Sequence, residues 1–489
     1  MFDIDWSKLP TLLQYQAEAP LLFTSGLFLF FFLGFFLVYR FTLHRTQLRL
    51  WWVTLFSLYF YYKCAGIFWV LHVVLVVVDF HLARWMEQTE HKGERRWLLT
   101  LSLLVNLGML AYFKYTNYFL ELWANVSNGT FEPLDIFLPA GISFFTFQSL
   151  SYTIDVYRRE LKALDSMLDY AFFVTFFPQM VAGPIVRAAD FLPQIRRSPF
   201  VSKEDFGRGV FLFCIGLFKK AVVSDYISAN FVDRVFDAPQ QYTGLENLFG
   251  VYGYAMQIYC DFSGYSDMAI GIALLMGFHF PINFNSPYQS KSITEFWRRW
   301  HISLSSWLRD YLYIPLGGNK KGRFRTYLNL MITMVLGGLW HGAATRFIIW
   351  GGLHGLALGV ERLWKETFPG TPGWLRKSLG ALWTFHFVCF CWIFFRAQDM
   401  ETAGAMLQQI AFHFEPQVLG EFLNGYAPVV FWMVVGYALH LLPTSAEQKA
   451  QTLVTQLPLP VKALLITLFV ALVMQVKSSE VQPFIYFQF

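Results

Sequence analysis

The sequence carries little charge for its length. Only 15% of its 489 residues are Asp, Glu, Lys or Arg, whereas 55% are hydrophobic and 19% are aromatic. In soluble domains about a quarter of the residues are charged. This composition therefore excludes an ordinary soluble fold and predicts an all-α polytopic membrane protein. The net charge of +5 is explained by basic loops between apolar segments. Nucleic-acid binding therefore has no basis in this sequence.

Cysteines are few and follow no ligand pattern. The five cysteines are scattered through apolar segments, and Cys389 and Cys391 lack the two-residue gap of a redox or zinc site. We expect buried, unreactive thiols and no metal site. No Gly-x-Ser-x-Gly elbow occurs, so a serine acyl-enzyme of the hydrolase type has no support. No basic segment precedes the first apolar run, and we expect no cleavable signal peptide.

Long apolar windows recur along the whole chain. The first runs from Leu21 to Tyr39, and several later windows are shorter than the roughly 20 residues of a full crossing. Short windows predict re-entrant or broken helices. We predict a single membrane domain over residues 1–489, with about 11 spanning helices plus re-entrant and amphipathic helices. Basic loops after the first windows place the start of the chain outside the cytoplasm.

His341 stands inside an apolar stretch. Residues 327–340 carry no charge, and the nearest preceding arginine is Arg325, sixteen positions before His341 or about 24 Å along a straight helix. Arg346 follows after five positions and places His341 nearer to one membrane face than to the midplane. An ionisable side chain at that depth predicts a functional site. The alternative is a neutral histidine that is hydrogen-bonded to a carbonyl of a neighbouring helix.

The most basic region of the chain spans residues 283–325, with eight Lys and Arg against two acids. Apolar residues recur there at steps of three and four from Ile293 to Leu312, which predicts one amphipathic helix. Ser292 or Thr294 could cap its start. His301 falls on the buried face of this predicted helix.

The same region supplies candidates for substrate binding. Its guanidinium groups could hold the phosphates of a cytosolic anionic cofactor. The alternative is an interfacial helix whose arginines meet anionic lipid. The candidate binding residues are Trp297, Arg298, Arg299, Trp300, Ser305, Arg309, Asp310 and Trp340.

Asp261 and Asp267 are acidic residues within an apolar window. They flank Ser263 and Gly264. We expect them to mark a break in a helix rather than to take part in chemistry.

Several motifs together resemble a known family. They are Trp297-Arg-Arg-Trp-His301-Ile-Ser-Leu-Ser-Ser-Trp-Leu-Arg-Asp-Tyr-Leu-Tyr-Ile-Pro-Leu-Gly-Gly318, Gly337-Gly-Leu-Trp-His341-Gly-Ala, Pro139-Ala-Gly-Ile-Ser-Phe-Phe-Thr-Phe-Gln148 with Ser151-Tyr-Thr-Ile-Asp-Val-Tyr-Arg158, Phe177-Pro-Gln-Met-Val-Ala-Gly-Pro-Ile185, Asp261-Phe-Ser-Gly-Tyr-Ser-Asp267 and Trp392-Ile-Phe-Phe-Arg396. This combination resembles the membrane-bound O-acyltransferase superfamily, in particular its bacterial alginate O-acetyltransferase branch. The resemblance covers residues 135–400, the expected catalytic core.

The resemblance implies a helical membrane disc that an acyl donor enters from the cytoplasm and an acceptor from the other face. It implies that His341 is catalytic and that His301 is the second polar position of the site. The expected activity transfers an acetyl group from a cytosolic thioester, acetyl-CoA, towards hydroxyls of an extracytoplasmic polysaccharide such as alginate. A periplasmic serine-hydrolase-like acetyltransferase would be its partner, the bacterial inner membrane its location, and no tightly bound cofactor is expected.

The chemistry is consistent with these residues. A neutral histidine can take the proton of an attacking hydroxyl near pH 7, and burial keeps a histidine neutral. His341 is the candidate base, or a transient acyl carrier, and His301 is the candidate donor to the developing negative charge. The alternatives are peptidoglycan O-acetylation, D-alanyl transfer to teichoic acid or, in another class, a transporter or flippase.

Overall fold

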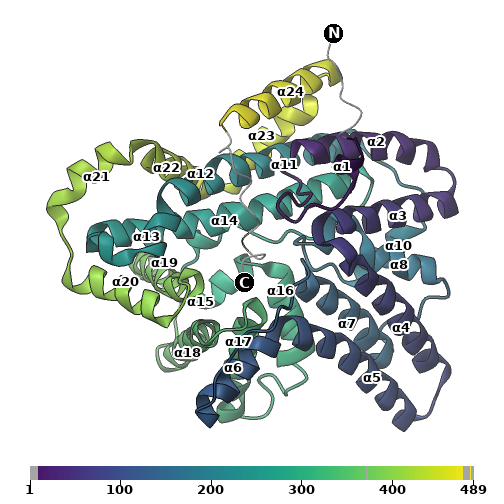
Figure 1. Ribbon diagram of the computed structural model, residues 1–489, viewed down its shortest axis with the longest axis horizontal. Coiled ribbons are helices and arrows are strands. Elements are labelled where there is room, and N and C mark those ends of the chain that lie inside the picture. The colour runs from purple at the N-terminus through teal and green to yellow at the C-terminus, as the bar shows by residue number, and fades with distance from the viewer. Residues whose placement is uncertain (1–8, 371–372, 477–484, 486–489) are drawn as a thin grey trace. The chain divides into compact units, whose positions relative to one another are not determined.

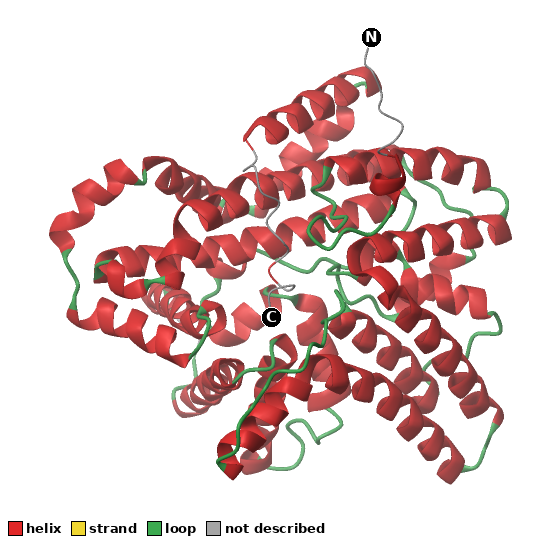
Figure 2. Ribbon diagram, in the orientation of Figure 1, coloured by secondary structure: helices red, strands yellow, loops and turns green. Residues whose placement is uncertain are grey.

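The computed structural model describes residues 9–370, 373–476 and 485. These residues form helices joined by loops and contain no strand (Figure 2). The chain divides into two compact units: residues 1–202 with 272–280, and residues 203–271 with 281–489. The prediction of an all-α protein is therefore confirmed for the described residues.

The first unit is made of helices from the N-terminal part of the chain (Figure 1). They are α1 (Leu9–Leu13), α2 (Gly26–Thr42), α3 (Thr46–Ala65), η2 (Gly66–Phe68), α4 (Trp69–Gln88), α5 (Lys92–Leu110), η3 (Ala111–Tyr115), α6 (Thr116–Ser127), α7 (Ile142–Arg158), α8 (Met167–Thr175), α9 (Phe177–Met180) and α10 (Ala188–Ile195). Aromatic rings fill its core. The ring of Phe177 lies 5.4 Å from that of Phe35 and 5.2 Å from that of Phe56.

The second unit contains both predicted catalytic histidines. Its helices are α11 (Lys203–Leu217), η4 (Phe218–Ser224), α12 (Asp225–Ile227), η5 (Ser228–Val232), α13 (Asp233–Asp237), η6 (Pro239–Gln241), α14 (Gly244–Leu275), η7 (Pro287–Gln289), α15 (Ile293–Arg299), α16 (Ile302–Leu308), η8 (Arg309–Tyr313), α17 (Arg323–His341), α18 (Thr345–Thr367), α19 (Trp374–Arg396), α20 (Met400–Phe412), η9 (Pro416–Val418), α21 (Leu419–Gly425), α22 (Ala427–Leu441), α23 (Thr444–Gln456) and α24 (Leu459–Val476). The last residues of α14 are counted with the first unit.

Fewer helices qualify as membrane spans than the sequence predicts. In the described residues, three helical runs are long and apolar enough to cross a membrane: Thr46–Gln88, Lys92–Ser127 and Trp374–Arg396. Two further pairs pass the same test but are bent, by 94° between α21 and α22 and by 120° between α23 and α24, which brings the number to five. The expected number of about 11 spans is not confirmed. The bent pairs agree with the expectation of broken or re-entrant helices.

α17 and α18 form a hairpin around close backbone contacts (Figure 1). A Cβ atom on Gly338 would lie 2.2 Å from the carbonyl oxygen of Phe347, and one on Gly351 would lie 2.3 Å from that of Met334. Any side chain at either glycine would push the two helices apart. The glycines before His341 thus allow the packing that fixes the end of α17.

α14 is continuous through Asp261 and Asp267, so the predicted helix break is wrong. Both carboxylates are paired with lysines of η4: Asp267 lies 2.7 Å from Lys219, and Asp261 lies 2.5 Å from Lys220. Glycines of α11 and α14 meet nearby and let the two helices approach closely. Since each acid has a cationic partner, the helix continues without a break.

Candidate active site

His301 lies at a break between two short helices. α15 ends at Arg299, and His301 is the N-cap residue of α16 with φ +44° and ψ 56°. The single amphipathic helix expected from Ile293 to Leu312 is therefore wrong, although its predicted cap is confirmed because Ser292 Oγ accepts a hydrogen bond from Glu295 N at 3.2 Å. The left-handed backbone of His301 turns the chain. The apolar residues keep their spacing across this bend, so their periodicity does not reveal it.

The imidazole of His301 is fully buried between aromatic rings and polar groups. Its ring centroid lies 4.6 Å from that of Phe262, with perpendicular planes. Its Nδ1 lies 3.2 Å from Asn283 Oδ1. His301 stands outside the candidate membrane spans, and burial lowers its pKa to about 3. The imidazole is thus neutral near pH 7.

His341 is the last residue of α17 and is only 2% exposed. Its ring centroid lies 5.1 Å from that of Trp350 on α18 and 5.2 Å from that of Phe395 at the end of α19. Arg346 Nη1 donates a hydrogen bond to the carbonyl oxygen of Phe395 at 2.7 Å. Three helices of one unit thus fix the surroundings of this imidazole.

Trp340 contacts both histidines. Its ring centroid is 6.0 Å from that of His301 and 5.0 Å from that of His341. The indole is 4% exposed. The second unit therefore places both predicted catalytic imidazoles against one buried aromatic side chain.

Trp350 joins a third histidine to this group. Its ring centroid lies 4.8 Å from that of His354, which is fully buried. Trp297 Nε1 donates a hydrogen bond to His354 Nδ1 at 3.3 Å. This bond connects α15, next to His301, with α18, next to His341.

Comparison with known proteins identifies the family. The family model described as "MBOAT, membrane-bound O-acyltransferase family" matches residues 24–400. The chain belongs to this family. A peptidoglycan O-acetyltransferase of Helicobacter pylori is 39% identical over 419 residues, 79% of each chain, and a probable alginate O-acetylase AlgI of Pseudomonas putida is 38% identical over 496 residues, 96% of this chain and 100% of the relative. A teichoic acid D-alanyltransferase of Bacillus subtilis is 31% identical over 266 residues, 51% of this chain and 66% of the relative.

The chain is accordingly a membrane protein and an acyltransferase of the MBOAT family. These relatives favour an enzyme over the alternative of a transporter or flippase. They also agree with the resemblance that its motifs carry.

The basic residues of the predicted binding region are exposed or partly exposed, and two of them pair with acids. Arg298 is exposed. Arg299 forms an ion pair with Glu295 at 2.8 Å, and Arg309 pairs with Asp310 at 2.6 Å. That these groups hold a phosphate stays a prediction.

Two further predicted binding residues have contacts within the protein. Trp300 is 1% exposed and its ring stacks on that of Phe296 at 5.6 Å. Ser305 Oγ donates a hydrogen bond to the carbonyl oxygen of Trp300 at 3.2 Å. Both residues stabilise the bend at His301, and their binding of substrate stays a prediction.

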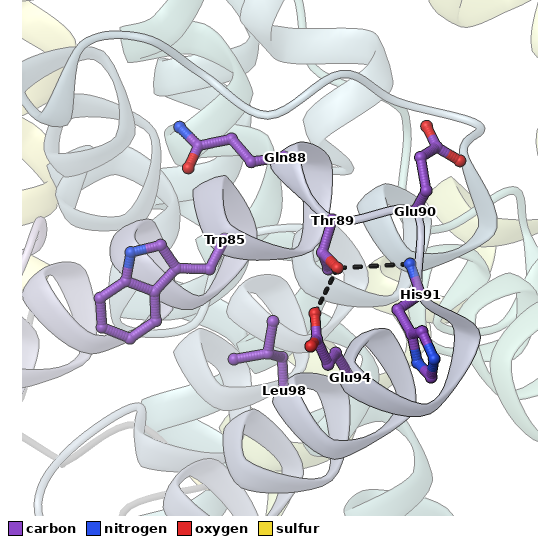
Figure 3. A pocket seen from close by; sticks show the side chains of 7 residues that line it. All are labelled: Trp85, Gln88, Thr89, Glu90, His91, Glu94 and Leu98. Carbon is purple, nitrogen blue, oxygen red and sulfur yellow. Dashed lines mark hydrogen bonds between the residues drawn. The ribbon is translucent and has the colours of Figure 1, made fainter.

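An open hollow of about 560 Å³ lies at the turn between α4 and α5, in the first unit (Figure 3). Thr89 Oγ1 donates a hydrogen bond to Glu94 Oε2 at 2.5 Å and accepts one from the backbone N–H of His91 at 3.3 Å. None of the predicted site residues lines it. We assign this hollow no part in the chemistry.

Sequence reasoning missed most of the residues that surround the two histidines. Asn283 was not predicted, although it lies in a short polar segment between Pro281 and Pro287 that could have drawn attention to it. The sequence motifs gave His354 no part in the chemistry. Phe395 lies in the last of the motifs that resemble the family, but that motif gave it no role.

Proposed function

We propose that the protein transfers an acetyl group from acetyl-CoA on the cytoplasmic side towards hydroxyls of an extracytoplasmic polysaccharide such as alginate. The bacterial inner membrane would hold the protein as a multi-pass enzyme. A periplasmic acetyltransferase would complete the transfer to the polymer. The observation that carries the proposal is the burial of His301 and His341 against the same indole, that of Trp340.

The reaction needs few groups. An oxygen of the acceptor hydroxyl forms a bond to the acetyl carbon, the bond from that carbon to the sulfur of CoA breaks, and the thiolate leaves. The hydroxyl proton passes to a neutral imidazole and from there to the thiolate. A hydrogen-bond donor stabilises the negative charge on the carbonyl oxygen during the step. Two buried imidazoles can divide these tasks.

The relatives support the proposal that the group transferred is acetyl and that the acceptor is a polysaccharide. The probable alginate O-acetylase of Pseudomonas putida aligns with almost the whole chain, 96% of it. The peptidoglycan O-acetyltransferase of Helicobacter pylori is equally similar, at 39% identity, but aligns with 79% of the chain. Peptidoglycan O-acetylation is therefore the second candidate. The D-alanyltransferase aligns with only 51% of the chain and supports D-alanyl transfer less.

Complementation of a deletion strain tests the proposal. Secreted polysaccharide and isolated peptidoglycan are assayed separately for base-labile acetyl esters, and teichoic acid for D-alanine. We expect acetyl esters on the secreted polysaccharide to return with the wild-type gene and to stay absent with His341→Ala. Esters on peptidoglycan alone would favour the second candidate. Normal acetylation by His341→Ala would refute the catalytic assignment.

A matched control separates catalysis from folding. His440 is another buried histidine of the second unit, and its Nε2 accepts a hydrogen bond from Tyr288 N at 3.0 Å. The side chain of glutamine can accept the same bond, so His440→Gln should remain folded and active. Membrane levels of both variants are compared by immunoblot.

A further inference from the structure

Asn283 makes polar contacts that bear on the chemistry of His301. The side chain is 1% exposed and lies in the loop between α14 and η7. Its Oδ1 accepts hydrogen bonds from Ser303 N at 3.2 Å and from Ser303 Oγ at 2.9 Å, and lies 3.2 Å from His301 Nδ1. Its Nδ2 donates to Ser266 Oγ at 3.2 Å. One amide thus joins α14, the loop and α16.

These contacts fix which way the amide points. The oxygen and nitrogen of an asparagine side chain are distinguished by their partners. A backbone N–H can only donate, so the atom that faces Ser303 N must be the oxygen. A second backbone bond, from Ile302 N to the carbonyl oxygen of Asn283 at 2.9 Å, holds the two segments in register.

The orientation of the amide fixes the tautomer of His301. An amide oxygen accepts and never donates, so His301 Nδ1 carries the proton in the bond to Asn283. A neutral imidazole has one proton, and burial keeps His301 neutral, with a pKa lowered to about 3. Nε2 therefore presents a lone pair.

We propose that Asn283 is a positioning residue that holds the proton of His301 on Nδ1, so that His301 acts at Nε2 as a proton acceptor and not as a donor to the carbonyl oxygen. This inference rests on the proposed function. It gives His301 the task of taking the hydroxyl proton, and it leaves stabilisation of the carbonyl oxygen to His341 and other donors. The proton moves from the hydroxyl oxygen to His301 Nε2 while the bond from oxygen to the acetyl carbon forms.

The backbone of His301 strengthens this interpretation. A non-glycine residue at φ +44° is uncommon, and the bend places the imidazole against the amide of Asn283. Ser303, two residues later, supplies the donors that orient that amide. A bend of this kind is retained when the surrounding contacts require it.

Two substitutions of Asn283 test the proposal through the pH dependence of the enzyme. Asn283→Ala removes the acceptor at Nδ1, and we expect a fall in kcat of about tenfold or more with little change in KM. Asn283→Asp keeps an oxygen for Ser303 N, and Ser266 Oγ can donate to the new carboxylate, so the fold is retained. The negative charge stabilises the imidazolium and raises the pKa of His301.

The sign of the effect separates the two roles. If His301 accepts the proton, protonation inactivates it, and the ratio of Asn283→Asp to wild-type kcat/KM falls as the pH decreases from 8 towards 5. If His301 donates, the imidazolium is the better donor, and the ratio stays constant or rises at low pH. Release of CoA thiol from acetyl-CoA by the full chain in proteoliposomes provides the rate. A constant or rising ratio overturns the proposal.

Nitrogen-15 NMR of histidine-labelled protein in proteoliposomes tests the tautomer without reference to activity. The signals of His301 are assigned by their loss in His301→Asn. We expect a protonated, pyrrole-type Nδ1 and an unprotonated, pyridine-type Nε2 in the wild type, and a mixture of both tautomers in Asn283→Ala. A proton on Nε2 in the wild type would overturn the proposal. This measurement still decides the matter if Asn283→Ala does not fold.

Asn247 supplies the structural control. It is fully buried in the same unit, and its Nδ2 donates to the carbonyl oxygen of Pro239 at 3.0 Å. Asn247→Ala should lower the melting temperature but leave the pH profile and the His301 signals unchanged. If His341→Ala releases CoA at the wild-type rate, the proposed function itself fails. If His341→Ala is inactive while Asn283→Asp shows the wild-type profile, only the present inference fails.

Discussion

His301 and Trp340 meet with ring centroids 6.0 Å apart and planes inclined by 65°. Trp340 lies on α17, one position before His341. His301 comes from another element, at the bend between α15 and α16. The contact therefore connects two of the motifs that carry the family resemblance, and the indole of Trp340 lies against both imidazoles.

Substitutions that truncate the side chain of Trp340 should separate a loss of catalytic rate from a loss of stability. Trp340→Ala leaves a cavity beside both imidazoles and should lower kcat at least tenfold, because a misplacement of about 1 Å is costly to catalysis. Trp340→Phe keeps an aromatic ring and should lower kcat only a few-fold. Rates of CoA release and melting temperatures are measured for both variants.

Trp392 is the control for this experiment. It is 1% exposed, and its ring lies 5.9 Å from that of Trp350 and 5.0 Å from that of Trp300. Trp392→Phe should lower the melting temperature as much as Trp340→Phe does, with a smaller effect on kcat. An equal loss of kcat in the two phenylalanine variants would mean that Trp340 acts through stability alone.

The backbone conformation of His301 predicts that different substitutions of this residue change the stability of the protein to different extents. Its φ of +44° suits glycine and asparagine better than alanine. His301→Ala should therefore be less stable than His301→Asn, by about 1 kcal/mol. Both should lose most of the acetyl transfer, since neither supplies an imidazole. Equal melting temperatures for the two variants would contradict the backbone argument, and full activity of His301→Asn would contradict a role in proton transfer.

The two lysines of η4 should differ in their effect on stability. Lys220 is buried and pairs with Asp225 at 2.6 Å and Asp261 at 2.5 Å. Lys220→Met leaves two buried carboxylates without that cation and should destabilise the protein by about 3–5 kcal/mol. Lys219 and Asp267 are each about one-fifth exposed, so Lys219→Met should cost less. Thermal unfolding in detergent measures both.

A second variant shows whether the charge is the cause. Lys220→Met combined with Asp225→Asn and Asp261→Asn removes the uncompensated carboxylates and should recover much of the lost stability. If the triple variant is as unstable as Lys220→Met alone, the loss comes from packing and the ion pairs are not its cause.

Sequence patterns predicted the class of fold and the two histidines but not their surroundings. His341 was recognisable because an ionisable residue within an apolar run is unusual. The pairing of Lys220 with Asp261 was not recognisable, because 41 positions separate them in the sequence and only the packing of η4 against α14 brings them together. Asp261 alone suggested a break in the helix, whereas its pairing with Lys220 is compatible with a continuous one.

The bend at His301 was missed for a related reason. Hydrophobic periodicity reports which residues are buried, and Phe296 and Leu304 are buried on both sides of the bend. It does not report a left-handed φ at a single position. Asn283 escaped notice because its importance depends on hydrogen bonds to Ser303 and His301, which are distant in sequence. Those contacts exist only once the bend has formed.

Gly342 is the position at which the smallest substitution should have a large effect. A Cβ atom there would lie 1.9 Å from Cε2 of the Phe347 ring. Gly342→Ala must therefore displace that ring or the backbone that follows His341, at a cost of about 1–3 kcal/mol. The ring of Phe347 also packs on Phe395 at 5.2 Å, and Phe395 lies against His341. We expect both the melting temperature and kcat to fall.

Removing the ring should reverse part of this loss. Phe347→Ala alone leaves a cavity and is destabilising, but in Gly342→Ala with Phe347→Ala the new methyl group has space. The double variant should be more stable than the sum of the two single effects predicts, by about 1 kcal/mol or more. Additive effects on the melting temperature would place the strain elsewhere. Recovery of stability without recovery of kcat would show that Phe347 is needed to hold Phe395 against His341.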